Sequence, residues 1–169
     1  MFDVLSRMMR TGILSESPEA SLDDLQKGIY RTVGRALAIR QLDAGSCNGC
    51  ELEIQALNNP YYNLEGQGIH FVASPRHADL LLVTGPVSVN MEGALLRTFN
   101  AMPDPKLVVA VGACGACGGI FGRSYACRGA VANVIPVDVT VSGCPPEPRK
   151  ILEGIFEALR AKGSSVTEG

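Results

Sequence analysis

The sequence contains no tryptophan, and aromatic residues make up only 5% of its 169 residues. A folded core must therefore be packed largely from aliphatic side chains. An excess of basic residues is missing too, because 15 Lys and Arg stand against 17 Asp and Glu, with a formal net charge of -2. Without a basic field to hold phosphate groups, nucleic acid is not an expected partner.

Long hydrophobic runs are also absent. The longest, such as residues 80–83 and 107–111, fall far short of the roughly 20 apolar residues that a membrane-spanning helix needs, so we expect no transmembrane segment. Residues 1–10 lack the long apolar stretch and small-residue cleavage site of a secretory signal. We therefore expect a cytoplasmic location, where cysteines are ligands or buried thiols more often than disulfides.

The length fits one well-buried domain. We expect an N-terminal helical arm at residues 1–21, a single α/β domain at residues 22–161 and a polar tail at residues 162–169. The domain is predicted to open with an amphipathic helix, because apolar residues recur at helical spacing. These residues are Leu25, Ile29, Val33 and Leu37.

Short, nearly continuous apolar segments then alternate with helical patterns. Such alternation favours a parallel α/β sheet whose strands are covered on both faces. About four to five strands are expected, flanked by helices. The predicted strands lie at about 37–43, 69–73, 79–84, 107–111 and 134–141, and the predicted helices at about 50–58, 90–101 and 147–161.

Four of the six cysteines lie just after predicted strands. Cys47 and Cys50 follow the first strand, Cys114 follows the strand at 107–111, and Cys144 follows the last strand. Ligands of open parallel sheets bind outside the carboxyl ends of the strands, so cysteines distant in sequence can meet there. Four thiolates are the ligand set of a 4Fe-4S cluster, and neighbouring glycines allow backbone N–H groups to approach the sulfurs.

The residues alone leave alternatives open. A Cys-x-x-Cys pair also occurs in thioredoxin-like proteins and zinc sites, and free cysteines are often buried core residues. Cys117 could replace Cys114 as the third ligand, or form a second redox centre with it. We prefer Cys114, because it comes first after the strand. Cys127 is expected to pack as a hydrophobic residue beside Tyr125.

Four motifs, in this order and over roughly residues 35 to 160, resemble the 20 kDa subunit family of respiratory complex I. Within it, the chain is most similar to small subunits of membrane-bound, energy-converting nickel-iron hydrogenases of the formate hydrogenlyase type. Complex I proper typically has adjacent cysteines where this chain has a spaced pair. The motifs are Cys47-Asn48-Gly49-Cys50-Glu51-Leu52-Glu53, Ser74-Pro75-Arg76-His77-Ala78-Asp79, Gly112-Ala113-Cys114-Gly115 and Gly143-Cys144-Pro145-Pro146.

The resemblance implies a flavodoxin-like fold in which Cys47, Cys50, Cys114 and Cys144 bind one 4Fe-4S cluster. It further implies an electron relay between a ferredoxin-like iron-sulfur subunit and a catalytic nickel-iron large subunit. Membrane subunits would anchor this complex, with the chain peripheral at the cytoplasmic face.

Two other functions remain open, a complex I-like subunit that reduces quinone or another carrier and a zinc-binding structural module. Glu51 and Glu53 follow Cys50 on the predicted first turn of a helix, where the helix dipole favours carboxylates. An ordinary helix-start role is one interpretation of these acids. The other is a proton path towards the large subunit.

Overall fold

The computed structural model describes residues 34–165, with side chains described to residue 161. At its centre lies a five-stranded sheet in the order β2-β1-β3-β5-β7, with every neighbouring pair parallel. This is the flavodoxin-like strand order, and it confirms the fold that the family resemblance implies. The strands are β1 (Leu37–Asp43), β2 (Ile69–Phe71), β3 (Leu80–Thr84), β5 (Leu107–Val111) and β7 (Val139–Val141).

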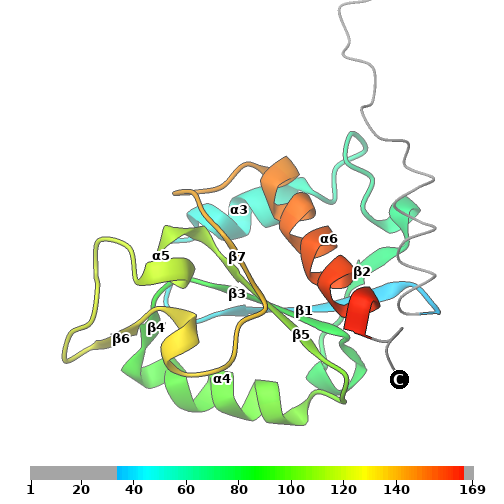
Figure 1. The fold of residues 1–169 in the computed structure, drawn as a ribbon. Helices are drawn as coiled ribbons and strands as arrows, with labels where there is room; N and C mark the ends of the chain where they lie inside the picture. The colour runs from blue at the N-terminus through cyan, green and yellow to red at the C-terminus, as the bar shows by residue number, and fades with distance from the viewer. Residues whose placement is uncertain (1–33, 166–169) are drawn as a thin grey trace, which may run out of the picture.

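Helices cover both faces of the sheet (Figure 1). Helices α3 (Gly49–Ala56) and α6 (Pro148–Ser165) pack on one face, and α4 (Val89–Ala101) packs on the other. In β3, alternate side chains enter the two cores, Leu82 on the α3 and α6 side and Leu81 on the α4 side. The apolar runs of β3 and β5 are fully buried, as expected for strands covered on both faces.

Two aspartates fix the register at the amino edge of the sheet. Asp79, just before β3, accepts a hydrogen bond from the Ala38 backbone N–H in β1 (3.0 Å). Asp138, just before β7, accepts one from the Val108 N–H in β5 (2.7 Å), and its own N–H donates to the Val108 carbonyl (2.9 Å). Each carboxylate thus satisfies a donor at the start of the neighbouring strand.

Replacing Asp138 with alanine should lower the free energy of unfolding by about 1–3 kcal/mol, because the Val108 N–H loses its acceptor. Urea unfolding of the purified chain measures this. Asp104→Ala is the control, since the Asp104 side chain is 83% exposed and its Oδ1 lies 3.4 Å from the Lys106 Nζ. The free energy of unfolding of the Asp104→Ala variant is expected to change by less than about 0.5 kcal/mol. Equal losses in both variants would contradict the role of Asp138.

The last predicted strand is wrong over residues 134–138. The short helix η3 (Val131–Asn133) precedes these residues, and β7 begins only at Val139. Pro136 has no N–H to donate to a strand ladder, and Val134 and Val137 pack instead against the core on the α4 side. The apolar residues at 134–137 are thus explained by packing against the core on the α4 side, and not by a strand.

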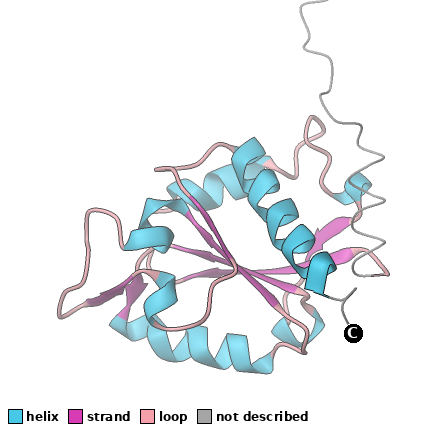
Figure 2. Ribbon diagram, in the orientation of Figure 1, coloured by secondary structure: helices cyan, strands magenta, loops and turns pink. Residues whose placement is uncertain are grey.

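Other elements differ from the sequence patterns as well. Helix α5 (Gly112–Cys117) is too short and glycine-rich to show an amphipathic stripe, and β4 (Val87–Ser88) pairs with β6 (Cys127–Gly129) in a small antiparallel sheet beside the main one (Figure 2). Helix α6 continues to Ser165, farther than predicted. The helix predicted from residue 22 lies outside the described residues up to 33, and Leu37 opens β1.

Two short 3-10 helices, η1 (Glu65–Gln67) and η2 (Pro75–His77), lie in the connections that lead into β2 and β3. Within the part of the chain that the structure describes, no helix has both the length and the apolar character needed to cross a membrane.

Candidate metal centre

The four predicted ligands lie on three connections at the carboxyl edge of the sheet. Cys47 and Cys50 lie between β1 and the first turn of α3, Cys114 in α5 directly after β5, and Cys144 between β7 and α6. Because β1, β5 and β7 run in parallel, these connections meet at the same edge (Figure 1). The strand order reverses between β1 and β3, where this fold commonly binds its ligand.

The four thiols influence one another electrostatically. Burial raises the pKa of the Cys50 thiol from 9.0 to about 11, and the charges of Glu51, Cys114, Cys47 and Cys144 add to this rise in that order. Burial, followed by Cys144, Cys47 and Cys117, also raises the pKa of Cys114. Bringing four thiolates together thus requires nearby positive charge, which iron ions supply.

Two glycines form a cradle around the sulfurs. Gly112 has a φ of +84°, and a Cβ there would lie 2.6 Å from the Cys50 Sγ. Gly119 has a φ of +54°, and a Cβ there would lie 2.7 Å from the Cys114 Sγ. Both positions are restricted to glycine by conformation and by space. The close backbone approach and the four-thiol donor set fit an iron-sulfur cluster.

A single-ion site is a different geometry. Within the part of the chain that the structure describes, no group of three or more His, Cys, Asp or Glu side chains is arranged to hold a metal ion. A structural zinc would need sulfurs within about 2.3 Å of one point.

Hydrogen bonds shape the loop that carries Cys47. The Asp43 Oδ1 accepts the N–H groups of Gly45 and Ser46, both at 2.7 Å. The Ser46 hydroxyl donates to the Glu51 Oε2 (2.6 Å) and accepts the Asn48 N–H (3.1 Å). Asp43 and Ser46 are not among the residues predicted from the sequence, although an aspartate two residues before a glycine at a strand end is a recognisable turn signal.

The two acidic residues after Cys50 differ in their surroundings. Glu51 is only 7% exposed, lies in the first turn of α3, and has an Oε1 atom without a hydrogen-bond partner among the described residues. Glu53 is half-buried. The position of Glu51 in the first turn of α3 fits the helix-start role. Its Oε1 atom, which has no partner among the described residues, can still accept a hydrogen bond near Cys50.

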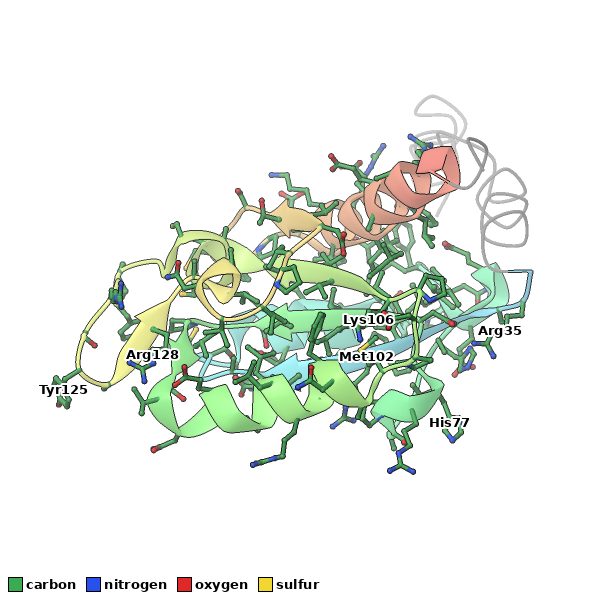
Figure 3. The ribbon with its side chains drawn as sticks, turned by 60° about the horizontal axis from the view of Figure 1, so that its bottom comes forward. Arg35, His77, Met102, Lys106, Tyr125 and Arg128 are labelled. Carbon is green, nitrogen blue, oxygen red and sulfur yellow. The ribbon has the colours of Figure 1, made fainter. Side chains whose placement is uncertain are left out.

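Cys117 and Cys127 lie at the margins of this site. The Cys117 thiol is exposed at the end of α5 and donates to the Ala113 carbonyl (3.2 Å). Cys127 is half-buried in β6, whereas Tyr125 is 98% exposed and its side chain points away from the protein (Figure 3). The expected packing of these two side chains is therefore wrong. A turn between Ser124 and Cys127 separates them, with the Ser124 N–H donating to the Cys127 carbonyl (2.9 Å).

In the chain freed of metal, alkylation by iodoacetamide at pH 8 should modify Cys47 and Cys144 at least about tenfold faster than Cys50. Only the thiolate reacts, and burial together with a pKa of about 11 suppresses this form at Cys50, whereas Cys47 and Cys144 are exposed. Mass spectrometry of timed digests measures the three rates. Full unfolding in urea is the control and should bring them together; equal rates in the folded chain would contradict the burial of Cys50.

The fold and the placement of these residues define a class, a flavodoxin-like α/β protein with four cysteines on the connections at the carboxyl edge of its sheet. Residues 47–158 match the family described as NADH ubiquinone oxidoreductase, 20 Kd subunit. The chain belongs to this family of oxidoreductase subunits, and the match begins at Cys47.

Its relatives include subunits of hydrogenases and of quinone-reducing complexes. The chain is 41% identical to formate hydrogenlyase subunit 7 of Escherichia coli over 141 residues, which cover 83% of this chain and 55% of that protein. It is 45% identical over 131 residues to the probable membrane-bound hydrogenase subunit mbhJ of Pyrococcus furiosus, 78% of either protein. An NADH-quinone oxidoreductase subunit of Herpetosiphon aurantiacus is 42% identical over 109 residues, 64% of this chain and 60% of that one.

Solved structures agree with the fold. A chain of the archaeal membrane-bound sulfane sulfur reductase superposes with a TM-score of 0.68 at 31% identity, over 82% of this chain and 77% of that one. A chain of an NAD+-reducing [NiFe]-hydrogenase superposes with a TM-score of 0.58 at 19% identity, over 76% of this chain and 93% of that one. This likeness shows a shared fold only. The relatives thus belong to oxidoreductases of more than one kind, two of which are described as membrane-bound.

Proposed function

We propose that Cys47, Cys50, Cys114 and Cys144 hold one 4Fe-4S cluster and that the chain is the electron-transfer small subunit of a membrane-associated nickel-iron hydrogenase. The observation that carries the proposal is the meeting of these cysteines, from three connections, at one edge of the sheet. When bound, the cluster supplies one-electron transfer. The chain contributes the thiolates, and Gly112 and Gly119 keep side chains away from the sulfurs.

The partners in this proposal are a ferredoxin-like iron-sulfur subunit, a catalytic nickel-iron large subunit and membrane subunits that hold the complex at the cytoplasmic face. Protons and hydrogen are interconverted in the large subunit. Asn48 and Gly49, which separate Cys47 from Cys50, favour hydrogenase over complex I. Asn48 has a φ of 71° and precedes α3, so these two residues form the turn that carries Cys50 into the helix.

A complex I-like role in reducing quinone is the second candidate, supported by the 42% identity to an NADH-quinone oxidoreductase subunit. Purification of the native complex separates the two, with iron, sulfide and nickel measured alongside hydrogen evolution from a low-potential donor. Nickel with hydrogen evolution supports the hydrogenase. Iron and sulfide without nickel, together with quinone reduction, would favour the second candidate, and zinc without iron would overturn both.

The proton path through Glu51 or Glu53 stays a prediction. If Glu51 serves it, Glu51→Gln should lower hydrogen evolution by the complex at least about tenfold, because the amide cannot exchange the proton. The same assay applies to Glu53→Gln. The control is the cluster's spectroscopic signal, which should be unchanged, and Glu65→Gln, in η1, should keep full activity. Full activity in both the Glu51 and Glu53 variants would remove the path from this chain.

A further inference from the structure

Within the described part of the chain, one edge of the sheet is open next to the Cys47 loop. β2 pairs with β1 only along Leu37–Ile39, and its chain leaves the sheet after Phe71. β1 continues to Asp43. An open groove lies where β2 ends, lined by Arg40, Gln41, Asp43, Phe71, Val72 and Ala73.

Among residues 34–165, the backbone of β1 leaves hydrogen-bonding groups unpaired on the side of this groove. The Ile39 carbonyl accepts the Val72 N–H on the β2 side, whereas the Ala38 carbonyl accepts the Asp79 N–H on the β3 side. Peptide groups alternate along a strand, so those of Gln41 and Asp43 face the β2 side. There β2 has already ended and offers no residue opposite them. Such an edge is a template for another strand.

Arg40 adds a charge to the groove. Its Nε atom is buried and has no hydrogen-bond partner among the described residues. A buried, unpaired guanidinium N–H is costly, and a carboxylate is its best-matched acceptor. Arg40 shares a face of β1 with Leu42, which packs in the core on the α4 side. Asp43 points to the other face, where its Oδ1 already accepts two N–H groups.

We propose that the groove binds an extended segment of a partner subunit, which adds as a strand to the free edge of β1 and places an Asp or Glu side chain beside Arg40. Main-chain hydrogen bonds to Gln41 and Asp43 supply the affinity, and the pairing with Arg40 sets the register. The inference rests on one part of the proposed function, namely that the chain is a subunit of a larger complex. Because Asp43 shapes the loop before Cys47, this strand would also brace the loop.

Charge variants of the complex test the carboxylate. Arg40→Glu should lower the amount of this subunit recovered with a tagged large subunit at least about tenfold, whereas Arg40→Lys should lower it less than about threefold. Arg97→Glu, on the exposed side of α4, is the matched control and should leave recovery unchanged. Equal recovery of the Arg40→Glu and Arg97→Glu complexes would overturn the proposal.

Two measurements on the wild-type complex test the strand. The amides of Gln41 and Asp43 should exchange with deuterium at least about 100-fold more slowly in the complex than in the separated chain. A photoreactive residue in place of Ala73 should cross-link to one segment of a partner subunit that contains an acidic residue. Unprotected amides would overturn the proposal, and so would a cross-link to residues 1–33 of this chain. Iron content, sulfide content and hydrogen evolution test the proposed cluster and hydrogenase role independently of the strand. Failure of the strand proposal can therefore be told apart from failure of the proposed function.

Discussion

Replacing Cys114 with alanine should abolish the cluster's absorption and paramagnetic signals and reduce hydrogen evolution by the complex at least about 100-fold. The charges of Cys144 and Cys47 act on the Cys114 thiol, and a Cβ built at Gly119 would lie 2.7 Å from its sulfur. Removing one of four thiolates leaves an iron without its protein ligand. Iron and sulfide content per chain, measured in the purified complex, gives the result directly.

The controls are the remaining cysteines. Cys117→Ala and Cys127→Ala should retain iron and sulfide at the wild-type level, because the Cys117 thiol donates to the Ala113 carbonyl and Cys127 belongs to β6. This comparison decides between the two cysteines of the Cys114-x-x-Cys117 pair. Loss of the cluster in Cys117→Ala, with retention in Cys114→Ala, would transfer the third ligand position to Cys117.

The second large effect on cluster binding is expected from the single methyl group that an alanine adds at Gly112. Gly112→Ala should reduce the amount of bound cluster at least about tenfold while the chain remains folded, because the added Cβ would lie 2.6 Å from the Cys50 Sγ. Cys50 is held on α3, whose Ile54 is buried in the core, so its sulfur has little room to move aside. Iron and sulfide per chain are measured together with circular dichroism.

Gly122→Ala is the matched control for this variant. Gly122 also has a positive φ, +53°, but nothing lies within 4 Å of a Cβ built there. Both variants carry a similar conformational cost of about 1–2 kcal/mol, and only one crowds a sulfur. Equal loss of cluster in both would mean that backbone strain, and not the contact with Cys50, causes the effect.

Much of the fold can be predicted from this sequence because its central strands are buried on both faces. Continuous apolar runs such as 80–84 and 107–111 have no other stable location than the middle of a covered sheet. The prediction fails at 134–138, where apolar side chains serve the α4 core without a strand. It also fails at α5 and β4, since two to six residues are too few to display a period.

The candidate site could be predicted as a set of residues but not as a geometry. Strand-end placement alone brings Cys47, Cys114 and Cys144 to one edge, whereas the hydrogen bonds of Asp43 and Ser46 depend on a turn that no periodicity reveals. The exposed position of Tyr125 depends on the local turn before β6. Positions set by long-range topology were thus predictable, and those set by side-chain hydrogen bonds were not.

The amino and carboxyl ends of the strands carry different kinds of side chain, and this bears on when a cluster can be inserted during synthesis of the chain. Carboxylates of Asp79 and Asp138 secure the amino ends through bonds within the chain, whereas the predicted ligands at the carboxyl ends come from connections as far apart as Cys47 and Cys144. The fourth thiol is available only after the ribosome has made the chain through β7 and Cys144. Cluster insertion is therefore expected only after β7, the last strand of the described sheet, has been made, so that incorporation of iron would report that β7 has docked.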